Sequence, residues 1–164
     1  MRNRWRSLGR QRLQRNQYQS LMDAHPREAH PHAMELRQER RVKERPLVSV
    51  VDDDESVRES LPDLLGEFGF AVRAFSSAQE FLASDCVDQT RCLILDIAMP
   101  GMSGPELQRD LTLRRREIPI VFITAQREET VRLRLLEQGA IECLFKPFSD
   151  TALLEAVNSA LHPE

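Results

Sequence analysis

No stretch of this 164-residue sequence stays apolar for long. A membrane-spanning helix needs about 20 apolar residues, and a secretory signal needs an apolar segment of its own, so the sequence predicts neither. Cysteine is scarce as well, and Cys86, Cys92 and Cys143 lack the paired spacing of a metal site. Three cysteines exclude a disulfide framework and favour reduced thiols in a cytoplasmic protein. The length suits about one domain, since domains typically have ~100–200 residues.

The net charge of −3 averages two unlike parts of the chain. Residues 1–46 carry +7 and residues 47–164 carry −10. The first part has almost no periodic apolar pattern, so we predict a disordered basic extension in which Met34–Glu44 can form a short helix. A basic extension can bind nucleic acid or a membrane surface, but no aromatic stripe or basic amphipathic helix accompanies it. The preferred interpretation is a solvated tail, or upstream sequence that the natural protein lacks.

From Leu47 onward, short apolar runs alternate with amphipathic stretches. Five repeats of strand then helix predict an α/β fold, a doubly wound five-stranded parallel sheet with helices on both faces. The predicted strands are Leu47–Val51, Phe70–Phe75, Cys92–Leu95, Pro119–Ile123 and Ile141–Phe145.

Serines that precede amphipathic stretches predict where helices begin. Ser76 or Ser77 starts one helix, Ser103 with Glu106 starts another that ends near Arg115, and Ser149 or Asp150 starts the last. A polar helix is predicted over Arg127–Gln138, closed by Gly139, and the first helix should bend at Pro62 because proline lacks an N–H group.

Polar residues follow four of the predicted strands. Asp52–Asp54 follow the first strand, Asp96 the third, Thr124 the fourth and Lys146 the fifth. Ligands of open parallel sheets bind outside the carboxyl ends of the strands, so these groups are expected to meet at one edge.

Clustered carboxylates are stabilised by a hard cation such as Mg²⁺, and one carboxylate can act as a nucleophile toward phosphorus. A cation on the other side can neutralise the transferred phosphoryl group. Lys146, the only lysine in residues 47–164, suits that compact point charge better than an arginine would.

Each of these features has a structural interpretation when it is taken alone. Asp52–Asp54 can cap the first helix, and Asp96 can open a turn with Met99-Pro100-Gly101. Thr124 alone is a structural hydroxyl, and Lys146 before a proline is a surface charge. Taken together, they favour the phosphoryl-transfer site.

At these residues the sequence resembles the response-regulator receiver domain, the CheY-like fold of two-component signalling. The resemblance covers residues 47–164 and is closest to the FixJ-type subgroup. It rests on Val50-Val51-Asp52-Asp53-Asp54, on Leu93–Gly104 with the Asp96–Gly101 turn, on Phe122-Ile123-Thr124-Ala125, on Lys146-Pro147-Phe148, and on Ser76–Leu82 with Gly139-Ala140.

The resemblance implies a set of roles. Asp96 would accept the phosphoryl group, and Mg²⁺ or Mn²⁺ would be held by Asp53 directly, by Asp52 mainly through water, by Asp96, and by the backbone carbonyl of Ala98. Thr124 and Lys146 would bind the phosphoryl group, and the bond before Pro147 would be cis. The chain would then be a phosphoacceptor signalling domain rather than an enzyme. Its expected partners are a sensor histidine kinase or histidine phosphotransferase, a downstream protein, and a second copy after phosphorylation.

Three positions depart from the family pattern. Cys143 stands where receivers usually have an aromatic switch residue, Ala98 offers only a methyl group where a longer side chain is frequent, and Phe145 replaces a polar residue. The FixJ subgroup usually continues into a DNA-binding domain, whereas this sequence stops at Glu164, so no direct DNA binding is predicted for it.

The leading hypothesis is a stand-alone receiver that controls a protein partner. The alternatives are the receiver half of a FixJ/LuxR-type transcriptional regulator, a degenerate receiver that works without phosphorylation, and a phosphohydrolase of the haloacid-dehalogenase type. The last would use Asp52-x-Asp54 as its nucleophile motif, but residues 47–164 leave no room for a cap domain.

Overall fold

The computed structural model describes residues 34–36 and 45–163. The chain divides into two units, Met1–Arg45 and Pro46–Glu164. Residues 34–36 are helical, at the start of the predicted helix Met34–Glu44. The rest of that helix and of the predicted basic extension lies outside the described residues.

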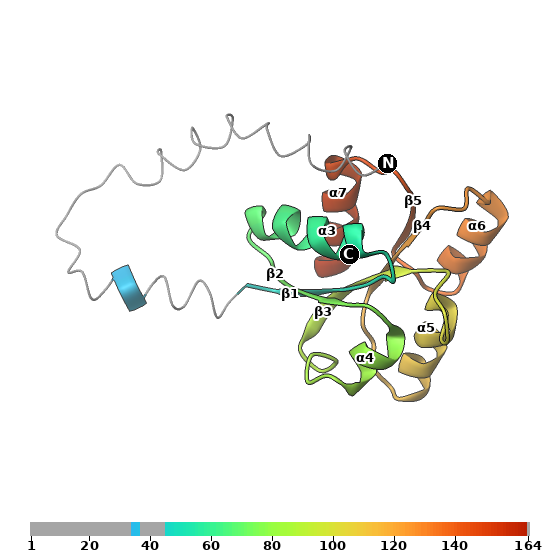
Figure 1. The fold of residues 1–164 in the computed structure, drawn as a ribbon, viewed down its shortest axis with the longest axis horizontal. Helices are drawn as coiled ribbons and strands as arrows, with labels where there is room; N and C mark the ends of the chain where they lie inside the picture. Colours follow the sequence, from blue (N-terminus) through green and yellow to red (C-terminus); the bar gives the residue numbers. More distant parts are fainter. Residues whose placement is uncertain (1–33, 37–44, 164) are drawn as a thin grey trace. The chain divides into compact units, whose positions relative to one another are not determined.

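The second unit is a five-stranded parallel sheet with the strand order β2-β1-β3-β4-β5, which confirms the predicted fold class (Figure 1). Its strands are β1 (Leu47–Val51), β2 (Ala71–Phe75), β3 (Thr90–Asp96), β4 (Ile120–Thr124) and β5 (Glu142–Phe145). Its helices are α3 (Glu55–Glu67), α4 (Ala78–Ala83), α5 (Gly104–Leu113), α6 (Glu129–Glu137) and α7 (Asp150–Leu161).

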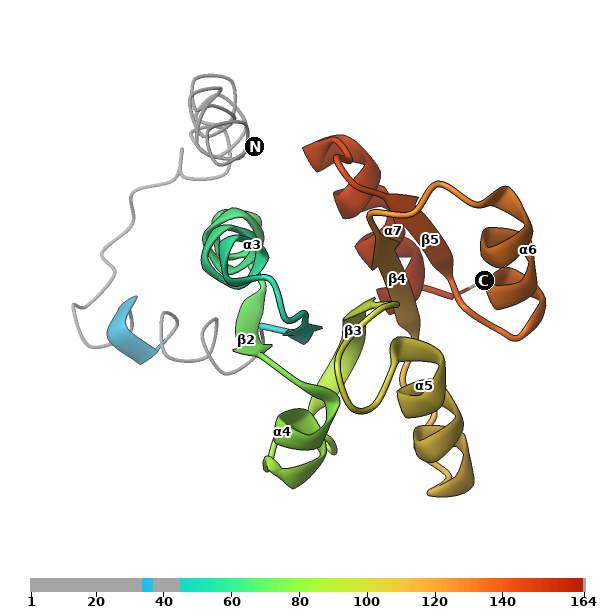
Figure 2. The ribbon, with the colours of Figure 1, turned by 45° about the vertical axis from the view of Figure 1, so that its right-hand side comes forward.

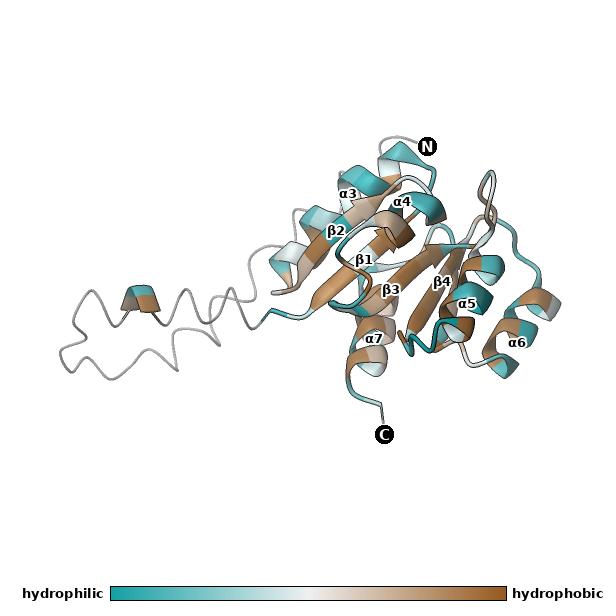
Figure 3. Cartoon of the chain, turned by 90° about the horizontal axis from the view of Figure 1, so that it is seen from below, coloured by the Kyte–Doolittle hydropathy of each residue, from teal (hydrophilic) through white to brown (hydrophobic). Residues whose placement is uncertain are grey.

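The helices cover both faces of the sheet. Helices α3 and α7 lie on one face, and α4, α5 and α6 lie on the other (Figures 1 and 2). A sheet that is covered on both faces has mainly apolar strands, as the largely brown colour of β1, β3 and β4 in Figure 3 shows. The inner strands β1, β3 and β4 are almost completely buried, so the carboxyl ends of these strands are held rigidly.

Three helices begin where their serines predicted. Ser77, Ser103 and Ser149 are N-caps whose hydroxyl oxygens accept the N–H of the third following residue, at 3.1, 3.3 and 3.1 Å. Around Ser103 the capping box is complete, because Glu106 accepts the Ser103 N–H in return, at 2.9 Å. This cap fixes the start of α5 directly behind the loop that follows Asp96.

Helix α6 differs from its predicted span. It begins at Glu129 rather than Arg127, and no side chain caps it. Neither Arg127 nor Glu128 has the short oxygen-bearing side chain that an N-cap needs, so the first orphan N–H groups lack a side-chain partner. Helix α3, in contrast, continues through Pro62 to Glu67; the bend expected there stays a prediction.

The three cysteines are free and buried. Burial raises the pKa of Cys92 to about 12 and, as the largest cause, the pKa of Cys143 to about 11.

Since the thiolate is the reactive form, we expect native protein at pH 8 to resist alkylation by iodoacetamide and the denatured protein to take up three labels. Mass spectrometry checks this, and a rapidly labelled native thiol would contradict it.

Among the residues that the structure describes, no helix is both long enough and apolar enough to cross a membrane.

Candidate phosphoryl-acceptor site

The predicted polar residues meet at the carboxyl edge of the sheet. Strands β1, β3, β4 and β5 lie side by side in that order. Val51 pairs with Leu95, so Asp52 and Asp96 follow at adjacent strand ends, while Thr124 pairs with Phe145 just before Lys146. The sheet therefore brings together four groups that are far apart in the sequence.

The three consecutive aspartates have different tasks. Asp54 is the N-cap of α3, and its Oδ1 accepts the N–H and the hydroxyl of Ser56 at 2.9 and 2.7 Å. Asp52 is completely buried, whereas Asp53 is exposed. The capping interpretation thus holds for Asp54 alone and leaves Asp52 and Asp53 available for the site.

Both carboxylate oxygens of Asp52 are hydrogen-bonded. Oδ1 accepts the N–H of Asp54 at 2.8 Å, and Oδ2 accepts from Lys146 Nζ at 2.8 Å. Lys146 Nζ also lies 3.8 Å from Oδ1 of Asp96. The lysine therefore neutralises a buried carboxylate and at the same time faces the second one.

Three carboxylates at the carboxyl edge of the sheet can hold a metal ion. Asp52, Asp53 and Asp96 each offer an oxygen, and the three oxygens lie within 4.8 Å of one another. A hard cation that prefers oxygen ligands fits this donor set, and Mg²⁺ is such a cation. Ala98, predicted to supply a backbone carbonyl, is exposed in the loop between β3 and α5; its role as a ligand stays a prediction.

Asp96 is 6% exposed and is poorly solvated. Burial, with the charge of Asp52 as the second cause, raises the pKa of Asp96 to about 7, against the opposing charge of Lys146. In the metal-free protein, ionising this carboxyl group therefore costs free energy, which a cation at the site would recover.

This cost predicts how stability depends on pH. Because the folded pKa of Asp96 is raised above 3.8, the folded state holds its proton longer than the unfolded state. Stability of the metal-free protein should fall by a few kcal/mol as pH rises from about 4 to about 7. Urea unfolding at a series of pH values checks this. The decrease should be smaller in Asp96→Asn; an unchanged decrease would show that other groups cause it.

Thr124 and Lys146 are linked through the backbone. The carbonyl of Thr124 accepts the N–H of Lys146 at 2.7 Å, and the buried Thr124 hydroxyl accepts the N–H of Gln126 at 3.1 Å. The peptide bond between Lys146 and Pro147 is cis. The hydroxyl and the ammonium group thus sit on adjacent strand ends beside Asp96.

Cys143, at the predicted switch position, is buried in the hydrophobic core cluster and pairs with Phe122 of β4. A small thiol fills this place in the core. A role of Cys143 in switching stays a prediction.

Two further residues near the site were not assigned a role from the sequence. Gly104 begins α5 against the backbone of Asp96, and Arg58 of α3 donates a hydrogen bond to the carbonyl of Asp52 at 3.0 Å. Gly104 follows the Ser103 cap directly in the sequence, which is a visible signal, whereas no sequence pattern distinguishes Arg58 from the other arginines.

The fold and the site together define a doubly wound α/β domain with an acidic pocket, a hydroxyl and a lysine at the carboxyl edge of its sheet. Residues 48–158 match the family described as "Response regulator receiver domain". The chain therefore belongs to the response-regulator receiver family, the signalling domains of two-component systems, in which phosphorylation of an aspartate is characteristic.

Relatives and solved structures agree with this family. Nodulation protein W of Bradyrhizobium diazoefficiens is 44% identical over 114 residues, which cover 70% of this chain and 50% of that protein. The transcriptional regulatory protein FixJ of Rhizobium meliloti is 39% identical over 113 residues, 69% of this chain and 55% of that protein. The chain thus spans about half the length of the curated relatives it matches.

Two solved structures have similar folds. The response regulator StyR superposes with a TM-score of 0.66 at 50% identity, covering 71% of this chain and 59% of that one. FixJ-N superposes with a TM-score of 0.64 at 38% identity, covering 72% and 94%. The likeness to the FixJ subgroup that the sequence indicated is confirmed. The family match over residues 48–158 favours the receiver over the phosphohydrolase alternative.

Proposed function

We propose that this receiver takes a phosphoryl group onto Asp96 from a phosphohistidine of a sensor histidine kinase or histidine phosphotransferase. The observation that carries the proposal is the position of Lys146 Nζ, 2.8 Å from Asp52 and 3.8 Å from Asp96. An ammonium group that is already anchored on one carboxylate can turn toward a phosphoryl group on the other without leaving the site.

The transfer divides into clear roles. A carboxylate oxygen of Asp96 forms a bond to phosphorus as the bond from phosphorus to the imidazole nitrogen breaks, and the electron pair leaves with the imidazole. Lys146 neutralises one phosphoryl oxygen and Thr124 donates its hydroxyl to another. Asp52, Asp53, Asp96 and the carbonyl of Ala98 would hold Mg²⁺ or Mn²⁺, which supplies the remaining charge neutralisation when bound. The domain catalyses only this transfer and its own dephosphorylation.

The test is direct phosphorylation. Incubated with a small phosphodonor and Mg²⁺, the protein should gain the mass of one phosphoryl group, and the gain should disappear with a chelator. Absence of any mass gain and of any response to beryllofluoride would overturn the proposal.

A second proposal concerns the output. Several relatives are named transcriptional regulatory proteins and are about twice as long as the matched region. This supports a regulator whose receiver, once phosphorylated, controls an attached DNA-binding domain outside this chain; the alternative is a separate protein partner. The reading frame beyond Glu164 discriminates between an attached DNA-binding domain and a separate partner. Sedimentation with and without beryllofluoride tests phosphorylation-dependent dimerisation.

The free thiols support a site of action in the cytoplasm.

A further inference from the structure

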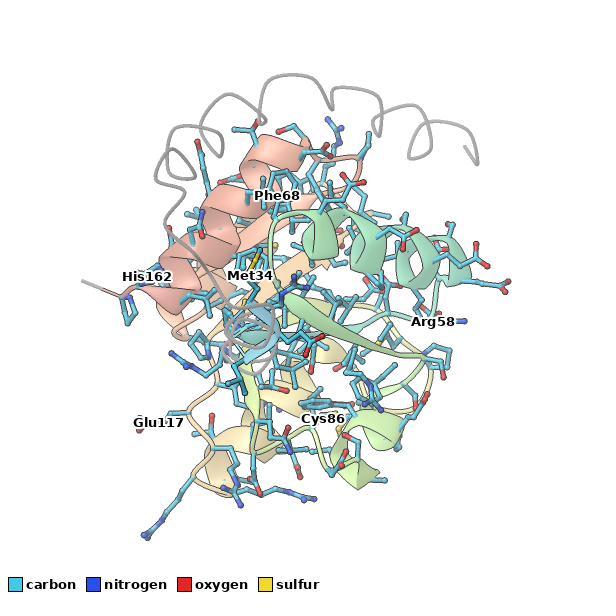
Figure 4. The ribbon with its side chains drawn as sticks, turned by 90° about the vertical axis from the view of Figure 1, so that its left-hand side faces the viewer. Met34, Arg58, Phe68, Cys86, Glu117 and His162 are labelled. Atoms are coloured by element: carbon cyan, nitrogen blue, oxygen red, sulfur yellow. The ribbon has the colours of Figure 1, made fainter. Side chains whose placement is uncertain are left out.

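Arg58 reaches from the first half of α3 to the segment after β1, which contains two of the acidic residues, Asp52 and Asp53. In Figure 4 its side chain extends near the end of α3 that lies opposite Phe68. Its Nη1 donates to the backbone carbonyl of Asp52 at 3.0 Å. Asp52 is completely buried, so a donor to its carbonyl spares a buried polar group from losing its hydrogen bond.

The segment that Arg58 contacts is held at several further points. The N–H of Asp52 donates to the carbonyl of Phe75 at the end of β2, at 3.1 Å, and the N–H of Arg58 itself donates to the carbonyl of Asp54 at 3.2 Å. The N–H of Asp54 in turn donates to Oδ1 of Asp52. Arg58 therefore closes a ring of hydrogen bonds around the short segment 52–54.

The charge of Arg58 also acts on Glu80 in the first turn of α4. Oε2 of Glu80 accepts the N–H and the hydroxyl of Ser76 at 2.9 and 2.6 Å, just after β2 ends. These two bonds are the main reason that the pKa of Glu80 is lowered, and the charge of Arg58 lowers it further. The guanidinium group of Arg58 thus donates to the carbonyl of Asp52, and its charge also acts on Glu80 of α4.

The choice of a carbonyl as acceptor matters for the acidic pocket. Lys146 pairs with a carboxylate oxygen of Asp52 and occupies it. Arg58 binds the carbonyl instead, so it restrains the same residue without taking a carboxylate oxygen from a metal ion. Residues that hydrogen-bond to metal ligands, without binding the metal themselves, hold those ligands in position. Their loss typically weakens metal binding by about 10–100-fold.

We propose that Arg58 is a positioning residue for the divalent cation: it fixes segment 52–54 so that the Asp52 and Asp53 carboxylates face Asp96. This inference rests on the proposed function, because it presupposes that a cation binds there.

The sign of the effect separates positioning from simple electrostatics. Arg58→Ala removes a positive charge beside a cation site, so electrostatics alone predicts tighter Mn²⁺ binding. Positioning predicts weaker binding, by about 10–100-fold. Arg91→Ala is the matched control. It removes the same positive charge, but Arg91 is exposed at the end of β3 that is remote from Asp96.

Mn²⁺ affinity is measured from the free Mn²⁺ signal in electron paramagnetic resonance, for wild type, Arg58→Ala and Arg91→Ala. In the same three proteins without metal, the rate of hydrogen exchange at the Asp54 amide is measured. Weaker Mn²⁺ binding together with faster exchange of the Asp54 amide, in Arg58→Ala but not in Arg91→Ala, supports the inference. If Arg58→Ala does not fold, Arg58→Gln takes its place in both measurements. Unchanged or tighter binding in Arg58→Ala overturns the inference, and the proposed function stands if Asp53→Asn still abolishes binding. No Mn²⁺ binding by wild type overturns both.

Discussion

Replacing Asp96 by asparagine is expected to abolish phosphoryl transfer to the receiver. The amide is a far weaker nucleophile than a carboxylate, and it also removes one of the three acidic oxygens that lie within 4.8 Å of one another. Intact-mass measurement after incubation with a small phosphodonor and Mg²⁺ should show one added phosphoryl group in wild type and none in Asp96→Asn.

The matched control for this variant is Asp63→Asn, an identical change on the exposed face of α3. It should be phosphorylated like the wild type. Asp96→Asn should also be no less stable than wild type in metal-free buffer, because it relieves the repulsion between Asp96 and Asp52. Phosphorylation of a folded Asp96→Asn protein would place the acceptor on another residue.

Replacing Gly104 by alanine is expected to cause the largest loss of stability. A Cβ atom there would lie 2.3 Å from the carbonyl oxygen of Asp96, and 3.1 Å from both the Cα of Ile97 and a ring carbon of Phe122. The first two contacts are with backbone, which cannot rotate away as a side chain does. We expect a loss of about 3 kcal/mol or more in the free energy of unfolding, as for severe overpacking, together with slower phosphorylation of Asp96.

Gly66→Ala gives the opposite expectation and serves as the control. Gly66 lies inside α3, and a Cβ atom there meets nothing within 4 Å. Alanine should stabilise the helix by roughly 0.5–1 kcal/mol, since it restricts the unfolded chain and favours helix. Urea unfolding of both variants checks the pair. Similar stabilities would mean that the β3–α5 loop yields freely, contrary to the close packing at Gly104.

The periodicity of the sequence was sufficient to predict the five strands and their order with the helices, because apolar spacing reports directly on burial. It was less accurate at the ends. Strand β3 runs from Thr90 to Asp96, longer at both ends than the predicted Cys92–Leu95. The reason is that Asp96 pairs with Ile123 in the sheet, and a polar residue at a strand end gives no periodic signal.

What the sequence by itself determined is the set of chemical groups at the strand ends: three carboxylates after β1, one at the end of β3, a hydroxyl at the end of β4 and a lysine after β5. The parallel order of strands then places them at one edge. Only the tertiary structure decided how they share their tasks. Asp54 caps α3 while Asp52 pairs with Lys146, 94 positions away, and Gly104 packs on the Asp96 backbone. Such contacts depend on distances between segments far apart in the chain, and local propensity carries no information about them.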